Sequence, residues 1–266
     1  MFIFKNLNRT FMDPGKFRYW KLSKKDNVEF LSFENWTGVK VFYSTRVGGV
    51  SPYPFDSLNL HYGRGDELNN VRANRKRFFD AVSIKEESVV FTKQVHSNIV
   101  NVVTDFSENL TGDGLITNKK GIFLGIFTAD CLAVFLNVPS QPLVGILHVG
   151  WRGAQKNIVK AGIRKISSLA DISPEELEAL FGPSIGPLYY EVGEDFLERF
   201  DRKYFIVKEE KFYLNMWEIV KDQLQSCGVK KIYVPGICSY SHPEIFYSYR
   251  REGKRVGENL GLIGIV

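Results

Sequence analysis

Hydrophobic residues in this chain come mostly in short runs, which polar residues or turn-forming glycines and prolines separate from one another. Apolar runs of about four to eight residues, and stretches in which apolar and polar residues alternate, are typical of β-strands. They predict strands at 39–46, 89–95, 98–104, 114–117, 122–128, 131–137, 143–149, 205–208, 211–214, 231–234 and 245–250.

Fewer segments have apolar residues at the spacing of a helix. Apolar residues three or four positions apart predict helices over 68–82, where Asp66 is placed to cap the first turn, and over 154–169. The segment 173–176 combines a capping Ser, a Pro and a Glu, which indicates a short helix. An Asn and a Glu with the same spacing begin a further predicted helix over 215–227.

Strands outnumber helices, and several follow one another without an intervening helix. This order favours an α+β or layered architecture with mixed sheets, and it argues against a doubly wound parallel sheet. The chain has 266 residues, no internal repeat and no linker rich in Pro, Gly or Ser, so a single domain is expected.

The most apolar stretch, 121–138, is a poor membrane span, because Asp130 lies inside it, Lys119 and Lys120 precede it and Pro139 follows it. Two buried strands explain it better. The N-terminus lacks the pattern of a signal peptide, and three Cys, an odd number, do not indicate a disulfide framework. A cytoplasmic protein with no membrane partner is expected.

The charge balance limits the classes of partner. The chain has 35 Lys and Arg against 30 Asp and Glu, and this net charge of +5 is scattered along the sequence. No nucleic-acid partner is expected, although a small anionic substrate needs only one or two cations. Neither GxGxxG nor GxxxxGK[ST] follows a predicted strand, so nucleotide binding at a helix N-terminus has no support.

Candidate metal ligands are scarce, since the chain has 4 His and 3 Cys. His96, Cys131 and His148 lie where predicted buried strands end, and two imidazoles with one thiolate suit zinc and leave a fourth position open for water. Their spacing matches no local metal motif. Buried structural roles, or a Cys131/His148 pair acting as a hydrolase, explain the same residues. His61 and His242 are expected on loops or at the surface.

Four further polar residues are candidates for a site. Arg46 lies in a glycine-containing segment, 45–51, and Arg152 precedes a predicted helix, so either guanidinium could bind a phosphate or a carboxylate. Asp113 and Asp130 could transfer protons or orient a His ligand. Structural turns with Arg–carboxylate pairs explain Arg46 and Arg152 equally well, and turn capping explains Asp113 about as well.

An ordered series of segments resembles the successive motifs of the YfiH/YlmD family, once labelled multi-copper polyphenol oxidoreductase or laccase-like and now described as purine nucleoside phosphorylase. The segments are TRVGGVS (45–51), LNL (58–60), NR (74–75), QVHS (94–97), GDGLIT (112–117), TADC (128–131), HVGWRG (148–153), GPSIGPLYYEVG (182–193) and YSYRR (247–251). Each segment alone is weak evidence for the family, but the ordered set covers nearly the whole chain and is specific to the family.

The resemblance implies an α/β fold of the layered α/β/β/α type, with mixed sheets between helices. Residues 39–266 are then predicted to be the catalytic domain, and residues 1–38, which match no motif and are rich in Phe and Lys, an extension packed on it. The resemblance also implies a zinc site formed by His96, Cys131 and His148.

The implied activity is phosphorolysis of adenosine, inosine and 5′-methylthioadenosine, together with deamination of adenosine. The implied partners are therefore purine nucleosides and phosphate. By motif position, Arg46, Gln94 and Arg152 are the candidates for substrate binding. Asp113, Asp130 and again Arg46 are the candidates for catalysis.

The older laccase label fits the composition poorly. A multi-copper oxidase site needs on the order of ten His, and this chain has 4. A single copper ion with weak polyphenol oxidase activity stays an alternative to zinc, as does the cysteine hydrolase. One residue departs from the family pattern: Glu258 follows Gly257 where the family usually has an Arg, so the nucleoside preference is expected to differ.

Overall fold

The computed structural model describes residues 17–106 and 109–266, whose strands form two six-stranded sheets and one three-stranded sheet. The first sheet has the order β1-β2-β3-β15-β7-β4 and contains one parallel pair, β4 with β7. Its strands are β1 (Lys21–Lys25), β2 (Val28–Phe33), β3 (Val39–Ser44), β15 (Asn259–Ile265), β7 (Phe123–Thr128) and β4 (Val89–Phe91).

The second sheet has the order β14-β10-β8-β9-β6-β5 and is also mixed. Its strands are β14 (Lys231–Tyr233), β10 (Glu178–Phe181), β8 (Leu132–Val138), β9 (Leu143–Val149), β6 (Gly114–Thr117) and β5 (Val100–Val102). The small sheet consists of β11 (Glu191–Val192), β13 (Lys211–Leu214) and β12 (Phe205–Lys208).

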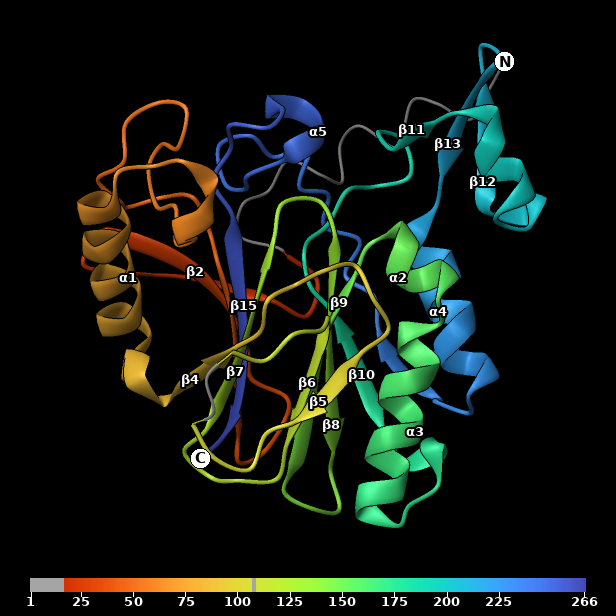
Figure 1. Ribbon diagram of the computed structural model, residues 1–266, viewed down its shortest axis with the longest axis horizontal. Helices are drawn as coiled ribbons and strands as arrows, with labels where there is room; N and C mark the ends of the chain where they lie inside the picture. Colours follow the sequence, from red (N-terminus) through yellow and green to blue (C-terminus); the bar gives the residue numbers. More distant parts are fainter. Residues whose placement is uncertain (1–16, 107–108) are drawn as a thin grey trace.

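Helices cover the outer faces of the two large sheets, except for the short α5 (Tyr249–Glu252), which lies above the sheets in Figure 1. The others are α1 (Leu68–Val82), α2 (Trp151–Gln155), α3 (Ile158–Ala170) and α4 (Met216–Ser226). Short 3-10 helices occupy Tyr62–Arg64, Glu86–Ser88, Pro174–Glu176, Glu194–Glu198 and Arg202–Tyr204.

Three hydrophobic clusters hold the layers together. In the first cluster, Phe78 of α1 packs on the outer face of the first sheet with Leu262. In the second, Phe135 and other residues fill the space between the sheets. In the third, Ile163 of α3 and residues of α4 pack on the second sheet. The predicted α/β architecture with mixed sheets between helices is confirmed.

The bounds of several strands were predicted well. The strands at 114–117, 143–149, 205–208 and 211–214 are confirmed at both ends. The apolar stretch 121–138 forms two buried strands, β7 and β8, as expected. No helix in the described parts of the chain is long and apolar enough to cross a membrane.

Three local predictions were wrong. The helix expected over 154–169 is two helices, because Asn157 between them has a left-handed φ of 60°. The segment 245–250 is not a strand: Ile245, Phe246 and Tyr247 are buried, but the last two residues of the segment belong to α5. Asp66 does not cap α1, because Glu67 occupies the cap position: the Asp66 carboxylate accepts hydrogen bonds from the Glu67 backbone N–H and from the side chains of Ser51 and Asn59.

The chain before residue 39 extends the first sheet. β2 pairs with β3 in antiparallel register, and Phe17 and Trp20 are buried in the cluster between the two large sheets. The domain boundary at residue 39 stays a prediction, and residues 1–16 of the predicted extension lie outside the described residues.

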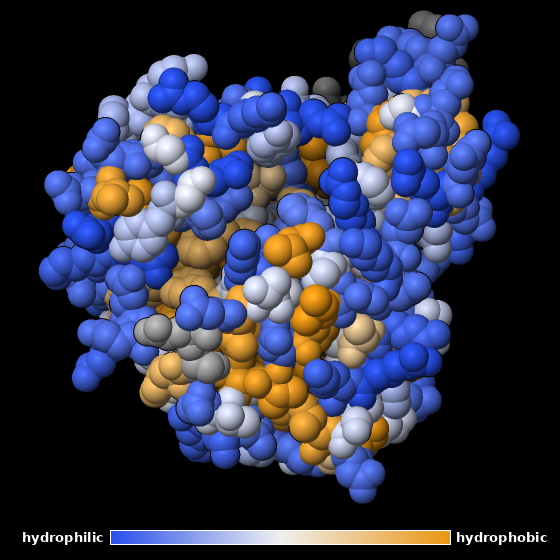
Figure 2. Space-filling model, in the orientation of Figure 1, coloured by the Kyte–Doolittle hydropathy of each residue, from blue (hydrophilic) through white to orange (hydrophobic). Residues whose placement is uncertain are grey.

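One face of the molecule is locally apolar. Apolar side chains gather in the lower centre of Figure 2, over β5 and β6. β5 is an edge strand, and the exposed large hydrophobic residues include Ile99 just before it and Val102 at its end.

Candidate functional site

The predicted ligands His96, Cys131 and His148 meet in the fold. Each offers one ligand atom, and these atoms all lie within 4.8 Å of one another. Within residues 17–106 and 109–266, this is the single group of three or more His, Cys, Asp or Glu side chains placed to share a metal ion.

Strand ends place the three ligands. Cys131 lies in the short link between β7 of the first sheet and β8 of the second, directly after Asp130, which has a φ of 94°. His96 lies in the loop after β4 with a φ of 56°, and His148 is the last residue but one of β9. The ligands therefore come from both sheets and meet where the sheets adjoin.

The backbone at Gly150 leaves room for this group. A Cβ atom at this position would lie 2.9 Å from the Cys131 Sγ and 3.3 Å from the His96 Cδ2. Contacts this short with a side chain would push the ligands apart, so glycine is needed here for close approach of the backbone.

Asp113 is fully buried and holds the site together. Its Oδ1 lies 2.8 Å from the His148 Nδ1 and accepts a hydrogen bond from the His96 backbone N–H at 3.0 Å. Its Oδ2 accepts hydrogen bonds from the backbone N–H and the hydroxyl of Ser97. Burial alone would raise the pKa of Asp113, but these bonds hold it well below its usual range. The ionised carboxylate orients the imidazole so that Nε2 is free to bind a metal ion.

Each of the neighbouring ligands Cys131 and His148 stabilises the charged form of the other. Burial disfavours the Cys131 thiolate, but the adjacent His148 and His96 outweigh this and lower the pKa of Cys131 to about 7. Burial also disfavours the His148 imidazolium, whereas Cys131 and Asp113 raise the pKa of His148. A thiolate and two imidazoles at this separation fit a tetrahedral metal ion with one open position.

The group borders a cavity of about 680 Å³, within the usual range for small-molecule sites. Residues on the side of the first sheet include His61, Arg64, Thr92, Lys93, Gln94 and Glu258. Residues on the side of the second sheet and its helices include Trp151, Arg152, Ile185, Tyr190 and Met216. The first side is mainly polar, although the Phe127 ring of β7 also lines it, and the second is mainly apolar and aromatic.

Three of the other predicted site residues line this cavity: Asp130, Arg152 and Gln94. The Asp130 carboxylate accepts hydrogen bonds from the Ser239 hydroxyl and the Arg250 backbone N–H, both at 2.7 Å, and burial raises its pKa. The Arg152 guanidinium lies over the Trp151 ring, 4.3 Å from its centre. The Gln94 amide forms two hydrogen bonds with the backbone of Phe127, so it shapes the wall of the cavity.

The structure does not bring Arg46 to the cavity. Its guanidinium donates hydrogen bonds to the backbone carbonyls of Asp56 and Pro243 and to the carboxylates of Asp56 and Glu252, and it stacks on the Tyr247 ring. Because structural acceptors already engage this side chain, its position gives no support to the predicted phosphate role.

Several residues that line the cavity were not among the site predictions. Lys93 follows the strand β4 without any motif signal, and His61, expected on a loop, does lie on one but faces the cavity. Glu258 stood out in the sequence only as a departure from a family pattern. Arg250 belongs to the YSYRR segment, and its position in that segment was the available signal.

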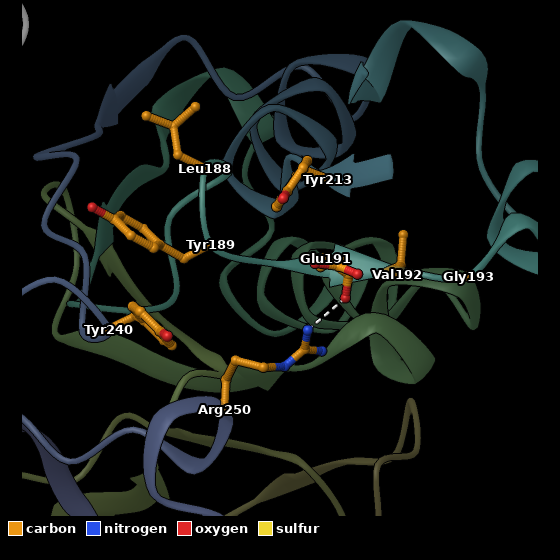
Figure 3. A pocket seen from close by; sticks show the side chains of 8 residues that line it. All are labelled: Leu188, Tyr189, Glu191, Val192, Gly193, Tyr213, Tyr240 and Arg250. Atoms are coloured by element: carbon orange, nitrogen blue, oxygen red, sulfur yellow. Dashed lines mark hydrogen bonds between the residues drawn. The ribbon is translucent and has the colours of Figure 1, made fainter. Parts of the chain in front are cut away.

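A second, more open pocket of about 470 Å³ shares Arg250 with the cavity. Figure 3 shows the Arg250 guanidinium directed at the Glu191 carbonyl, to which it donates a hydrogen bond. The rings of Tyr189 and Tyr240 stack nearby with centroids 4.8 Å apart. None of the three candidate metal ligands lines this pocket.

Comparisons with known proteins identify relatives over most of the chain. A family model described as "Multi-copper polyphenol oxidoreductase laccase" matches residues 40–266. Purine nucleoside phosphorylase YfiH of Escherichia coli (strain K12) is 34% identical over 236 residues, which are 86% of this chain and 95% of that protein. Purine nucleoside phosphorylase YlmD of Bacillus subtilis (strain 168) is 30% identical and aligned over 84% of this chain and 87% of its own length.

Solved structures agree with the sequence relatives. The crystal structure of YlmD from Geobacillus stearothermophilus matches with a TM-score of 0.85 at 28% identity, over 92% of this chain and 98% of that one. The Bacillus licheniformis protein YfiH matches with the same TM-score at 27% identity, over 92% and 99% of the two chains. The family model, the sequence relatives and the folds coincide, and the chain therefore belongs to the YfiH/YlmD family.

Proposed function

We propose that this chain is a zinc-dependent purine nucleoside phosphorylase that cleaves adenosine, inosine and 5′-methylthioadenosine and also deaminates adenosine. The observation that carries the proposal is the group His96, Cys131 and His148 at a cavity of nucleoside size. The names of the Escherichia coli and Bacillus subtilis relatives support the phosphorylase activity.

Zinc is the metal that this donor set favours, because it accepts thiolate and imidazole ligands in a tetrahedral arrangement. A zinc ion held by the three residues would supply the Lewis-acid activation of water that hydrolytic deamination requires. Asp113 acts as a positioning residue, since it fixes the tautomer and the direction of His148 and anchors the loop that carries His96.

Phosphorolysis requires the bond between the ribose C1′ and the purine N9 to break, while a phosphate oxygen bonds to C1′ and the departing purine gains a proton. Lys93 and Arg152 line the cavity and provide cations for the phosphate. Asp130 is the proposed proton donor, because it lines the cavity and burial raises the pKa of its carboxyl group. Arg46 is left out of the phosphate site because structural acceptors hold its guanidinium.

One further candidate has specific support. The lowered pKa of Cys131, next to His148, is also what a cysteine hydrolase needs for its nucleophile. The cysteine hydrolase does not require His96 or a metal. A copper oxidase rests on the description of the family model alone, and the three ligands offer a site for one ion.

The deciding experiment incubates the zinc-loaded protein with adenosine, with and without phosphate, and identifies the products by chromatography. Adenine that forms only with phosphate supports phosphorolysis, and inosine supports deamination. Both activities are expected to disappear in Cys131→Ser and His96→Ala but to persist in Cys227→Ser, a control at a half-buried cysteine outside the cavity.

The same variants separate the alternatives. Activity that survives chelation and His96→Ala but is lost in Cys131→Ser would identify a cysteine nucleophile. Oxidation of a polyphenol that needs added copper would identify an oxidase. If no nucleoside is turned over under either phosphate condition, the phosphorylase proposal is wrong.

A further inference from the structure

Glu258 presents a carboxylate to the cavity on the side of the first sheet. It lies directly before β15, whose first residue, Asn259, pairs with Thr128 at the end of β7, so Glu258 is close to the link that carries Cys131. Gly257 fixes the backbone here, because a Cβ atom at this position would lie 2.6 Å from the Tyr247 ring. The Glu258 side chain is 17% exposed.

The basic side chains near Glu258 leave its oxygens free to accept further hydrogen bonds. Its Oε2 lies 3.7 Å from the His61 Nε2, and its Oε1 lies 3.6 Å from the Arg64 Nε. Both separations are longer than a hydrogen-bond distance. The Arg64 Nε donates instead to the Val256 carbonyl at 3.2 Å. Among the described residues, no hydrogen bond to the Glu258 carboxylate is formed.

His61 supplies a donor beside this acceptor. Its Nδ1 accepts a hydrogen bond from the Gly63 backbone N–H at 2.9 Å, so the proton of the neutral ring is on Nε2, the atom that faces Glu258. The Phe127 ring meets the His61 ring edge-on, with centroids 4.7 Å apart, and so restrains its direction. Burial lowers the pKa of His61, which keeps the ring neutral at pH 7.

The two sides of the cavity suit the two halves of a nucleoside. The apolar and aromatic side, with Trp151, Ile185 and Tyr190, is suited to a purine ring. The side with Glu258 and His61 offers one carboxylate acceptor and one N–H donor. A vicinal diol complements this pair, because each hydroxyl donates one hydrogen bond and also accepts.

We propose that Glu258 and His61 form the subsite that binds the ribose 2′- and 3′-hydroxyls of the nucleoside. The Glu258 carboxylate accepts hydrogen bonds from the hydroxyls, and the His61 Nε2–H donates one to a hydroxyl oxygen. The inference rests on the proposed nucleoside-cleaving function and makes Glu258 a residue that selects ribose over deoxyribose. Loss of a hydroxyl bonded to a charged acceptor weakens binding by on the order of 10- to 100-fold.

Binding can be measured apart from turnover. The zinc-loaded full chain is titrated calorimetrically in phosphate-free buffer with inosine, 2′-deoxyinosine, 3′-deoxyinosine and hypoxanthine. Inosine cannot be deaminated, and without phosphate it cannot be phosphorolysed. The wild type is expected to bind inosine on the order of 10- to 100-fold more tightly than either deoxyinosine.

The variants assign this preference to Glu258. In Glu258→Ala the preference for inosine is expected to fall to the small part that the His61 hydrogen bond supplies, with hypoxanthine binding unchanged. Glu258→Gln keeps one acceptor oxygen and is expected to retain part of the preference. Glu87→Gln, an exposed glutamate outside the cavity, is the control with the same change in charge and should match the wild type. Melting curves establish that each variant is folded.

The outcomes separate this inference from the proposed function. Equal affinity of the wild type for all three nucleosides, or an undiminished preference in Glu258→Ala, overturns the ribose subsite even if phosphorolysis is observed. Loss of hypoxanthine binding in Glu258→Ala also overturns it, since Glu258 would then bind the base. A Glu258-dependent preference without phosphorolysis upholds the subsite and overturns the phosphorylase. No inosine binding by the wild type overturns both.

Discussion

At the scale of single residues, Asp113 shows how one buried carboxylate organises a site to which it contributes no ligand. It accepts hydrogen bonds from backbone and side-chain donors of the loop that carries His96, and it also engages His148. A group with this many donors is stable only as an anion, which is why its pKa is held low despite burial.

Asp113→Asn tests this role. The amide replaces one acceptor oxygen with a donor that faces other donors, so we expect the free energy of unfolding to fall by about 3 kcal/mol and zinc affinity to fall by about 10- to 100-fold. Urea unfolding and competition with a chromophoric chelator measure the two effects. The exposed Asp105→Asn is the matched control. Unchanged zinc affinity in a folded Asp113→Asn protein would contradict the role.

His61 gives a prediction about pH. Burial lowers its pKa below the unfolded value of 6.5, so below that pH the unfolded chain binds the proton more readily than the folded one. Stability is therefore expected to decrease as the pH falls through 6.5. His61→Gln should lose less stability than the wild type between pH 7 and pH 5 in urea unfolding. Parallel decreases in the two proteins would show that His61 does not contribute.

At the scale of elements, a helix cap that the sequence predicts lies next to a residue that lines the cavity. The Asn215 side chain caps α4 by accepting a hydrogen bond from the Glu218 backbone N–H at 3.2 Å, and the first residue of that helix, Met216, lines the cavity. Asn215→Ala is expected to lower the free energy of unfolding by about 1 kcal/mol, whereas Asn215→Asp should retain most of it. Thermal unfolding measures the difference, and equal losses in both variants would argue against a capping role.

Helices and strands that local patterns stabilise are predicted from the sequence, whereas those that depend on close packing or on a single backbone angle are not. The capping box at Ser173 and the central strands follow from local signals, and both are confirmed. β15 was missed because its glycines, such as Gly261 and Gly264, weaken a strand pattern, although they let Phe135 and Phe123 pack closely against the backbone. The break at Asn157 depends on one backbone angle that helical spacing does not reveal.

The candidate site likewise has residues that local sequence signals predict and residues whose roles depend on tertiary contacts. His96, Cys131 and His148 were identified by scarcity, strand ends and motif order, and the fold brings them together. Arg46 and Gln94 show the limit, because their partners come from distant parts of the chain: Arg46 bonds to Pro243 and Glu252, and Gln94 to the backbone of Phe127. Which polar groups are already engaged depends on tertiary contacts, and no spacing along the chain encodes them.

At the scale of the whole molecule, the candidate metal site lies where the two large sheets adjoin. Cys131 lies on the link between them, His96 follows a strand of the first sheet, and His148 belongs to a strand of the second. A metal ion bound by all three would therefore connect the two sheets. Because this arrangement exists only in the folded chain, metal binding must stabilise folding.

Zinc removal tests this connection. With free zinc buffered at about 100 times its dissociation constant, the wild type should gain about 2.7 kcal/mol of unfolding free energy over the chelated protein, and Cys131→Ser should gain almost none. Hydrogen exchange locates the gain: if zinc joins the sheets, amides of β7 in the first sheet and of β9 in the second should become protected together. Protection confined to the loop around His96 would mean that zinc orders only that loop, and equal stabilisation of Cys131→Ser would place the ion elsewhere.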